Sequence, residues 1–441
     1  MTLRDAFLRH LPSLGIAPGT SLVAVSGGPD SVALLDLLVQ TRSNHGLDLI
    51  VAHADHGIHP DSAGVSERVA SLARDFGLPV LLGRLELGAG ASETAAREAR
   101  YAWLEAARER AGAGLILTAH HADDQVETVL MRVLEGSGPA GLSGIAARNG
   151  RIVRPLLPFR RAELARYLHE RGLSGWDDPA NRNSRHQRSW IRGEVLPLLR
   201  ARNPEIDARL LRVAEQASAD RLAWDGLVDQ LAELGWKAEP DGCSVATTPL
   251  VTWERNLAAA LLMAAARRAG CVLGRSRASR VLEALGPAQR GARFDLGSGW
   301  FAEEAFGRLH LARRGVEGGE AAPLTLGGES GEIAWGPWRF RWQVDEAPGE
   351  HRRDGRTAWF IPGSLSVRGW QAGDRIHPLG GPGQRLLVRC FQEARVPRRR
   401  RQGWPVVSRA ERVVWLPGIC RSGALVPQPG SPSMRVDAVL A

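Results

Sequence analysis

Residues 26–31 read SGGPDS and combine glycine, hydroxyl and carboxylate groups in one turn between an apolar run and a helical one. Glycines let the backbone turn tightly with its N–H groups pointing inward, and the helix start adds partial positive charge. These properties predict a phosphate-binding loop. It is not a Walker A loop, because the Gly-x4-Gly-Lys-Ser/Thr pattern is missing. The alternative is an ordinary turn in which Asp30 or Ser31 caps the helix. The candidate phosphate-binding residues are Ser26, Gly27, Gly28, Pro29, Asp30 and Ser31.

Two carboxylates, Asp124 and Glu127, lie three residues apart at the predicted start of a helix over 124–135. This spacing places both side chains on one side of the first turn, where they can hold an ammonium group. Together with Asp30 or Asp123 they can also hold Mg²⁺, which prefers one or two carboxylates plus phosphate oxygens. Asp-x-x-Glu is also a variant of the capping box. The two interpretations are compatible, because a capped helix is a rigid mount for a ligand.

Arginines and histidines supply further candidates. Arg97 and Arg100 project three residues apart from a predicted helix over 93–110, although most surface arginines are simply solvated. His53 and Asp55 lie in a polar segment after a second apolar run, and His120 follows another.

Two basic segments with a nearby tryptophan offer phosphate contacts and a stacking surface for RNA. A basic run is often only a solvated face, so both interpretations stay open. The candidate RNA-binding residues are Arg188, Arg192, Arg389, Arg398 and Arg399.

The first two hundred residues alternate strand and helix patterns, which predicts an α/β fold with a doubly wound parallel sheet. The predicted strands cover 21–25, 47–52, 80–82 and 115–118, and the helices cover 32–39, 93–110 and 124–135. Because such sheets bind ligands outside the carboxyl ends of their strands, the segments after Val25, Ala52 and Thr118 should converge on one crevice.

The length of 441 residues suggests about three domains. A linker helix over 197–212 leads to a unit with predicted helices over 221–234, 250–268 and 276–285. A Gly/Glu-rich break at 315–320 and a strand pair over 335–344 follow. We therefore predict a catalytic domain with its linker helix over 1–212, a helical domain over 213–320 and a small α+β domain over 350–441.

Basic residues outnumber acidic ones by 57 to 48, for a formal charge of +9, which favours an anionic partner. No apolar run is long enough to span a membrane and the start lacks a signal-peptide pattern, so we expect no membrane partner and a cytoplasmic location. The 4 cysteines are widely spaced and form no metal motif, in agreement with a reducing compartment.

The SGGxDS segment resembles the signature of the N-type ATP pyrophosphatases, the PP-loop family, which cleave ATP between the α and β phosphates and adenylate a substrate. Within that group the chain is similar to the tRNA(Ile)-lysidine synthase family. The matching blocks are 93–101, 118–128, 136–142, 154–156, 177–181, 188–192 and 373–380. The stretch from about 210 to 350 matches only in position and helical character.

The resemblance implies a ligase that uses ATP and Mg²⁺ to join free lysine to C2 of the wobble cytidine of tRNA(Ile) with a CAU anticodon, through an adenylated tRNA. It implies that Asp30, Asp124 and Glu127 are catalytic, and that Arg97 or Arg100 neutralises phosphate charge. It further implies nucleotide contacts for His53, Asp55 and His120, and tRNA contacts for the two later domains. The family often continues with Leu-Arg where this chain has Ile58 and His59, so an arginine role has no match there.

Two alternatives remain at this point. A thiolase of the same PP-loop group would need cysteines near the ATP crevice, and the first two hundred residues contain none. A non-catalytic nucleotide-sensing or RNA-binding protein would have no need for three carboxylates beside a triphosphate, which they repel unless a metal intervenes. The sequence leaves a homodimer open.

Overall fold

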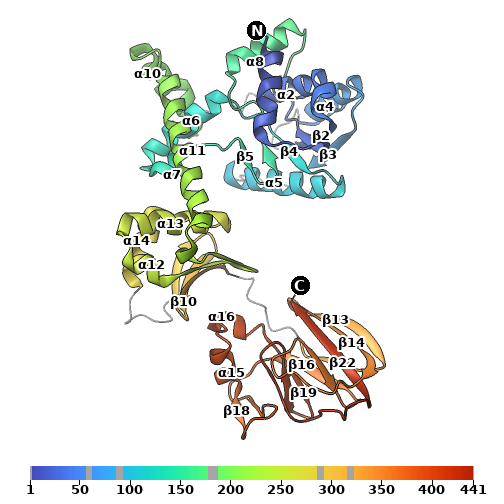
Figure 1. Ribbon diagram of the computed structural model, residues 1–441. Coiled ribbons are helices and arrows are strands. Elements are labelled where there is room, and N and C mark those ends of the chain that lie inside the picture. The colour runs from blue at the N-terminus through green and yellow to red at the C-terminus, as the bar shows by residue number, and fades with distance from the viewer. Residues whose placement is uncertain are drawn as a thin grey trace. The chain divides into compact units, whose positions relative to one another are not determined.

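The computed structural model describes residues 2–55, 62–85, 93–176, 187–285, 293–314 and 322–440 (Figure 1). Their contacts divide the chain into two compact units, Met1–Ala223 and Trp224–Ala441. Three segments singled out in the sequence, Ile58 with His59, the block 177–181 and the break at 315–320, lie outside the described residues.

The first unit is built on a six-stranded sheet of order β3-β2-β1-β4-β6-β5. All neighbouring strands are parallel except the edge pair β5–β6. The strands are β1 (Gly19–Ala24), β2 (Leu47–Asp55), β3 (Val80–Arg84), β4 (Leu115–Leu117), β5 (Arg148–Asn149) and β6 (Ile152–Val153). The predicted parallel sheet is confirmed, and β5 and β6 are two strands that the sequence did not reveal.

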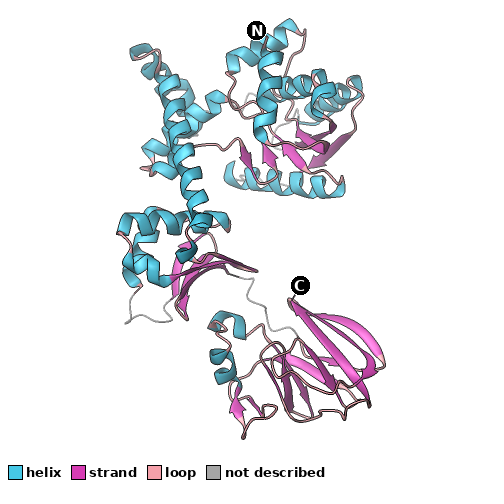
Figure 2. Ribbon diagram, in the orientation of Figure 1, coloured by secondary structure: helices cyan, strands magenta, loops and turns pink. Residues whose placement is uncertain are grey.

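Helices cover both faces of this sheet (Figure 2). Successive side chains of a strand point to opposite faces, and in β1 Val23 joins one buried cluster and Leu22 another. The first cluster holds α1, α2, α4 and α8; the second holds α5. The helices of this domain are α1 (Leu3–His10), η1 (Leu11–Leu14), α2 (Pro29–Gln40), α3 (Arg42–His45), α4 (Ser62–Asp75), α5 (Glu93–Arg110), α6 (Ala122–Leu134), α7 (Pro139–Leu142) and α8 (Arg161–Glu170). The doubly wound arrangement is therefore as predicted.

Helix α2 begins in the predicted phosphate loop, and the buried carboxylate of Asp36 fixes its position. The Asp36 side chain is fully buried; it accepts hydrogen bonds from the Tyr167 hydroxyl at 2.5 Å and from Arg171 Nε at 2.9 Å. A buried carboxylate must be paired, so these contacts fix α8 against α2. Helix α2 is thereby held by residues more than 130 positions away in the chain.

A helical stretch leaves the first domain through α9 (Gln187–Trp190), the π-helical segment η3 (Ile191–Val195), α10 (Leu196–Arg202) and α11 (Ile206–Gln230). Ile191 and Leu196 pack on Val126 and Leu130 of α6 in a separate buried cluster. The stretch is therefore anchored to the helix that carries the predicted carboxylates. Helix α11 runs through the domain boundary predicted at 212.

In the second unit, the helix predicted over 221–234 is the end of α11 with the turn η4 (Ala232–Leu234). The helix predicted over 250–268 is two helices, α12 (Thr247–Thr252) and α13 (Arg255–Arg268), and α14 (Arg275–Ala284) matches the one predicted over 276–285. They pack on a five-stranded sheet of order β7-β8-β11-β10-β9, which the sequence analysis did not predict. Its strands are β7 (Lys237–Glu239), β8 (Gly242–Ala246), β9 (Arg293–Gly297), β10 (Trp300–Ala305) and β11 (Arg308–Arg313).

The remaining residues form two mainly antiparallel sheets, of order β12-β16-β19-β20-β17-β18, with β21 on β20, and β13-β14-β22-β15. Strand β14 pairs along its whole length with β22, so the domain begins at Leu324, upstream of the boundary predicted at 350. The elements are β12 (Leu324–Leu326), β13 (Ser330–Trp335), β14 (Trp338–Glu346), β15 (Thr357–Phe360), β16 (Leu365–Gly369), β17 (Arg375–Ile376), β18 (Arg385–Leu386), α15 (Leu387–Glu393), α16 (Arg398–Arg401), β19 (Pro405–Arg409), β20 (Arg412–Leu416), β21 (Cys420–Arg421) and β22 (Pro432–Leu440).

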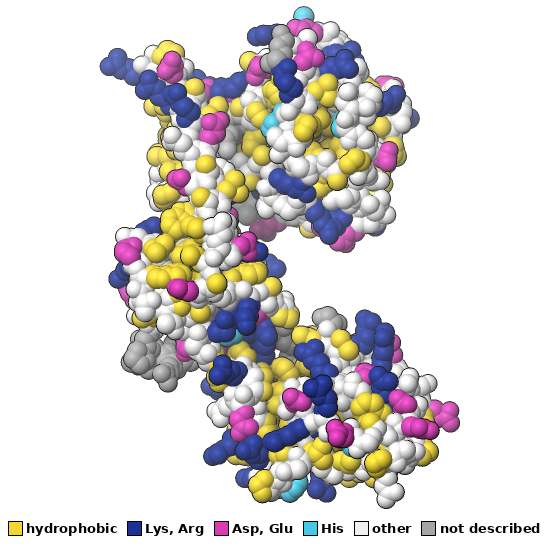
Figure 3. All heavy atoms as spheres, viewed as in Figure 1, with side chains coloured by type: hydrophobic (Ala, Val, Ile, Leu, Met, Phe, Trp, Pro, Cys, Tyr) yellow, Lys and Arg dark blue, Asp and Glu magenta, His cyan; other side chains and the backbone are white. Residues whose placement is uncertain are grey.

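Lysine and arginine side chains are spread over both units on the face drawn in Figure 3. Within the described residues, no helix is both long and apolar enough to cross a membrane.

Candidate functional site

The SGGPDS segment forms the turn between β1 and α2, with Gly28 as the N-cap residue of the helix. Gly27 has φ +87°, in the left-handed region, and a Cβ on it would lie 2.7 Å from Val65 Cγ1. Inside the turn, Gly28 N donates to Ser26 Oγ at 3.3 Å and the Ser31 hydroxyl donates to the Gly28 carbonyl at 2.8 Å. The turn therefore has the glycine geometry and the adjoining helix start that a phosphate loop needs.

A second chain segment braces this loop from behind. A Cβ on Gly175 would lie 2.3 Å from Pro29 N and 2.7 Å from the Gly28 carbonyl carbon, and Trp176 N donates to the Gly27 carbonyl at 2.8 Å. Only glycine fits between these backbones. The sequence analysis missed this contact, because nothing near Gly175 in the sequence points to a partner almost 150 residues earlier.

Replacing Gly175 with alanine is expected to weaken ATP binding by at least about tenfold, because the added methyl group must displace the backbone of the loop. The dissociation constant of ATP, measured by titration calorimetry, checks this. Gly64→Ala is the matched control, since a Cβ there meets nothing within 4 Å. Equal affinities for both variants would contradict the bracing role.

The end of β2 contacts the start of the phosphate loop. His53 and Asp55 lie inside β2, which is longer than predicted. The buried His53 ring donates from Nδ1 to the Val25 carbonyl at 2.8 Å. Burial lowers the pKa of His53, against the hydrogen bond to Val25 and the charge of Asp55. The neutral ring is thus fixed at the carboxyl edge of β1 and β2, where the two segments were predicted to converge.

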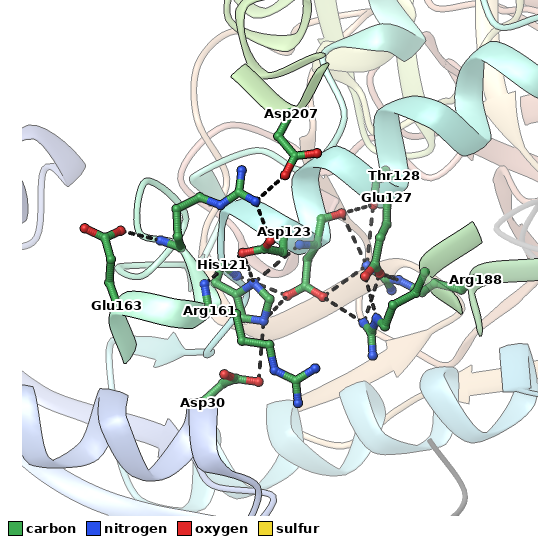
Figure 4. Close-up of polar contacts among 12 residues, drawn as sticks. Asp30, His121, Asp123, Glu127, Thr128, Arg161, Glu163, Arg188 and Asp207 are labelled. Atoms are coloured by element: carbon green, nitrogen blue, oxygen red, sulfur yellow. Dashed lines mark hydrogen bonds and ion pairs between the residues drawn. The ribbon is translucent and has the colours of Figure 1, made fainter. Parts of the chain in front are cut away.

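His121, the N-cap of α6, links the phosphate loop to the first carboxylate of that helix (Figure 4). Its Nε2 lies 3.4 Å from Asp30 Oδ2 and 3.7 Å from Asp124 Oδ2. Its backbone N–H donates to Asp124 Oδ2 at 3.0 Å and closes a capping box between His121 and Asp124, one turn earlier than the Asp124-x-x-Glu127 box that the sequence suggested. The predicted convergence of the segments after β1 and β4 is therefore confirmed, through a histidine that the sequence analysis passed over in favour of His120.

The charges around Asp30 favour its ionised form. Burial alone would raise the pKa of Asp30, but the hydrogen bond and charge of His121, with Arg161 and Arg192, lower it. The Arg161 side chain extends toward Asp30 in Figure 4. Burial lowers the pKa of His121 in its turn, and Asp30, Asp124 and Asp123 outweigh it and raise that pKa. Asp30 thus provides an ionised carboxylate at the first turn of α2 that can bind a cation.

Asp123 faces a different set of partners. One of its oxygens accepts from Arg160 Nη2 at 2.7 Å and the other from the backbone N–H of Arg161 at 2.8 Å. Arg160 also pairs with Asp207 of α11. Both carboxylate oxygens therefore accept from protein donors that tie α8 and α11 to α6, and the role of Asp123 as a Mg²⁺ ligand stays a prediction.

Glu127 is buried, and two guanidinium groups surround it. Arg192 Nε lies 2.6 Å from Oε1, and Arg188 Nε lies 2.9 Å from Oε2. Arg188 Nη2 also reaches Asp124 Oδ1 at 3.5 Å. Arg188 and Arg192 were predicted to contact tRNA, but here they neutralise the carboxylates instead. A buried carboxylate requires such pairing, and the same oxygens can accept from an ammonium group.

His120 lies in cationic surroundings. Its Nδ1 is 3.1 Å from the Thr118 hydroxyl. Burial, and after it the charges of four guanidinium groups, together lower the pKa of His120 to about 3; in decreasing order of effect these groups are Arg154, Arg97, Arg188 and Arg100. The predicted residues of α5 thus reach the same region as His120. His120 therefore lies near four arginines, whereas His121 lies beside Asp30 and Asp124.

The two histidines should contribute to stability with opposite pH dependence. Between pH 6.5 and about 3 the unfolded chain binds a proton that folded His120 rejects, so this contribution falls on acidification, by up to about 1.4 kcal/mol per pH unit. The contribution of His121 is complete below pH 6.5 and is lost as the pH rises through its raised pKa. Urea unfolding of the nucleotide-free wild type, His120→Asn and His121→Asn between about pH 4.5 and about pH 9 tests both signs. Parallel curves for the three proteins would contradict the assignment.

Gln125 holds the glycine-rich segment after α6 against the start of the same helix. Its Nε2 donates to the carbonyls of Ser143 and Ile145 at 3.2 and 3.1 Å, and Ile145 N donates to its Oε1 at 2.6 Å. Helix α6 ends at Leu134 and Gly136 has φ +68°, so the glycine-rich segment stops the helix.

The arginine run of α16 is only partly exposed. The Arg399 side chain is 2% exposed and pairs with Glu239 and with Asp241, the latter at 3.4 Å; Arg400 Nη2 lies 3.0 Å from Asp241. In this arrangement the buried side chain of Arg399 serves as an ion-pair partner, and its contact with RNA stays a prediction. Arg389 and Arg398 are exposed, as a phosphate contact requires.

Comparison with known proteins adds the class and the family. Residues 10–199 match the family model of the PP-loop domain, and residues 365–438 match that of the TilS substrate C-terminal domain. With its glycine-rich turn at the carboxyl edge of a parallel sheet, the first domain is a PP-loop, ATP-binding domain.

The tRNA(Ile)-lysidine synthase of Symbiobacterium thermophilum is 33% identical over 98% of this chain and 95% of its own length. The one from Geobacter sulfurreducens is 32% identical over 91% of this chain and 89% of its own. The chain belongs to the tRNA(Ile)-lysidine synthase family. A crystal structure of a TilS C-terminal domain, 22% identical, covers 27% of this chain and 98% of its own with a TM-score of 0.23.

Proposed function

We propose that this protein uses ATP to ligate free lysine to C2 of the wobble cytidine of tRNA(Ile) with a CAU anticodon, in the cytoplasm. One observation carries the proposal: His121 joins Asp30 of the phosphate loop to Asp124 of the carboxylate helix in a single crevice. ATP and the amine can therefore bind side by side. Adenylation of the C2 oxygen releases pyrophosphate, and attack by the lysine ε-amine on C2 then releases AMP.

Adenylation is required because an amide-like oxygen is a poor leaving group until it carries AMP. The turn over 26–31 would hold the phosphates, and His53, at the junction of β1 and β2, would lie on the adenosine side. Arg97 and Arg100 would neutralise the charge that develops on the phosphates during transfer. Both residues act electrostatically on His120, which supports a position beside the reacting groups.

Mg²⁺ fits the residues around the phosphate loop through Asp30. The described residues contain no group of three or more His, Cys, Asp or Glu side chains arranged to hold a metal ion. An ion held mainly by phosphate oxygens needs only one or two protein carboxylates. Asp30 is such a group, since its side chain is 26% exposed and its pKa is lowered. Bound there, Mg²⁺ would supply charge neutralisation for the phosphates.

Asp124 and Glu127 would bind the ε-ammonium group of lysine. In the structure the guanidinium groups of Arg188 and Arg192 pair with Glu127. When lysine binds, its ammonium group can replace part of this pairing and neutralise the carboxylates in their place. The amine has an unperturbed pKa near 10.4, so it must lose a proton before attack, and one of these carboxylates is positioned to accept it.

The tRNA would be held in part by exposed arginines of the C-terminal part, among them Arg389 and Arg398. Its cytidine must be splayed out to reach the crevice, as single-stranded RNA readers generally require. The proposal leaves the oligomeric state open, including a homodimer.

Incubation of the full chain with total tRNA, radiolabelled lysine and ATP tests the proposal. Label should enter tRNA only when ATP is present, with release of AMP and pyrophosphate. No label under any condition would overturn the proposed function. ATP binding without pyrophosphate release would instead favour a nucleotide sensor.

The thiolase alternative has no support in the chain. Its cysteines are Cys243, Cys271, Cys390 and Cys420, so the whole first unit, which holds the crevice, has none. All four are buried.

A further inference from the structure

Arg154 is a buried arginine near the proposed site, and the proposed reaction assigns no role to it. It follows β6, and β6 pairs in parallel with β4, where Leu117 lies opposite Val153. Thr118 N donates to the Val153 carbonyl at 2.9 Å, so the residues after the two strands leave the sheet side by side. Arg154 and His120 therefore both lie at the carboxyl edge of the sheet, where such folds bind ligands.

The charge of Arg154 lacks a counter-charge. The residue is only 6% exposed; Nη1 donates to the Ala146 carbonyl at 2.7 Å, and Nε is buried without a hydrogen-bond partner. Among the residues that the structure describes, no carboxylate forms an ion pair with it. Because an isolated buried charge is costly, a site of this kind calls for an anion.

A second buried arginine of the same domain shows the contrast. Arg108 is 4% exposed, its Nη1 also donates to a backbone carbonyl, that of Ala113, and its Nε also lacks a partner. Arg108 is nevertheless paired with Glu105 at 2.8 Å and with Glu109 at 3.2 Å. It also lies just before β4, at the amino edge of the sheet, away from the crevice. Arg108 thus shows that a buried arginine of this domain, away from the proposed site, has carboxylate partners, whereas Arg154 has none among the described residues.

The neighbours of Arg154 are cationic as well. Its guanidinium and those of Arg97, Arg100 and Arg188 all act electrostatically on His120, which stays neutral. Arg97 stacks on Tyr101, with Cζ 5.1 Å from the ring centroid. Four guanidinium groups therefore lie near His120, and of these Arg188 pairs with Glu127.

We propose that Arg154 binds an oxyanion of a substrate, either the α-carboxylate of the amino acid or a phosphate of the nucleotide. The inference rests on the proposed function. Strand order favours the carboxylate: in the order β2-β1-β4-β6, the phosphate loop follows β1, whereas Arg154 lies beyond β4, the strand that leads into Asp124 and Glu127. A lysine whose ammonium group binds those two residues would then present its carboxylate to the arginine side.

Arg154→Gln tests this inference in the full chain, since the glutamine amide can still donate to the Ala146 carbonyl. Three quantities are measured: KM for lysine in tRNA labelling, the inhibition constant of 1,5-diaminopentane, which has the same amine but no carboxylate, and the dissociation constant of ATP. For a carboxylate ligand, KM for lysine rises by about 10- to 100-fold while the diaminopentane constant stays unchanged. For a phosphate ligand, ATP binding weakens by a similar factor and KM for lysine holds.

Arg154→Lys keeps the positive charge but loses the planar guanidinium group. Whichever constant changes in Arg154→Gln, KM for lysine or the dissociation constant of ATP, should therefore change by an intermediate amount. This variant replaces Arg154→Gln if the latter does not fold. Arg108→Gln is the matched control, and it should lower the melting temperature without changing any of the three quantities. If folded Arg154 variants leave all three quantities unchanged, the inference is overturned. Arg154 would then have only a structural role, as a hydrogen-bond donor to the Ala146 carbonyl. A wild type that does not label tRNA would instead overturn the proposed function itself.

Discussion

Asparagine in place of Asp30 is expected to lower the rate of pyrophosphate release by about 100- to 1000-fold, comparable to the loss of one charge-stabilising group in other active sites. Asparagine can retain a hydrogen bond to His121 but not the negative charge that the lowered pKa of Asp30 maintains. Without that charge, Mg²⁺ loses its protein ligand beside the phosphates. Pyrophosphate release is measured with ATP, tRNA and lysine present.

Asp48→Asn is the matched control for this experiment, because Asp48 is exposed and lies on β2 of the same sheet. It should leave the rate unchanged. Wild-type pyrophosphate release by Asp30→Asn would remove Asp30 from the mechanism and with it the single Mg²⁺ ligand proposed here.

Glutamine in place of Glu127 is expected to separate the two half-reactions. Adenylation needs the phosphate loop, so pyrophosphate release in the presence of tRNA should stay within about tenfold of wild type, whereas transfer of lysine should fall by about 100-fold, because a neutral amide binds ammonium weakly. Rapid-quench measurement of AMP-linked and lysine-linked tRNA in one turnover distinguishes the steps.

The same variant should be destabilised, since Arg188 and Arg192 would lose the charge that pairs with them. Removing one partner of a buried ion pair costs about 3 kcal/mol or more. The turnover experiment therefore needs a temperature well below the melting point of the variant, with Glu135→Gln, an exposed change just after α6, as the control. Equal losses in both half-reactions would contradict a role confined to the amine.

The sequence could reveal those parts of the site that are written in adjacent residues. The phosphate loop is recognisable because its glycines, serines and aspartate stand together between a strand and a helix. Helix α5 has the predicted bounds 93–110, and α6 begins within two residues of the prediction, because long periodic segments and caps are local signals.

Residues whose task depends on distant partners could not be identified in this way. Gly175 is needed only because the backbone of Pro29 passes beside it, and His121 matters through Asp30, which precedes it by about ninety positions. Asp123 and Arg399 were predicted from residue type, but their actual partners come from other elements. The sequence shows that a charged residue needs a partner, but the identity of that partner depends on which elements the fold brings together.

The missed sheet of the second unit has the same origin. Strands β8 and β11 pair across more than sixty residues of sequence, and three helices lie between them. Short strands that pair at such distance carry little local periodicity, so the three predicted helices dominated the sequence pattern. The strand pair predicted over 335–344 corresponds to β14 and only the last residue of β13, and the membership of β14 in the last domain depends on its pairing with β22.

The order of strands in the first sheet has a practical consequence. Each group proposed to touch a different part of the substrates follows its own strand: the loop over 26–31 follows β1, the helix with Asp124 and Glu127 follows β4, and Arg154 follows β6. Mutagenesis aimed at new amine donors could therefore be confined to the ends of β4 and β6. Libraries built there with His121 kept, because it contacts Asp30, would leave the phosphate loop unchanged, which makes this scaffold a rational starting point for attaching other amines to RNA.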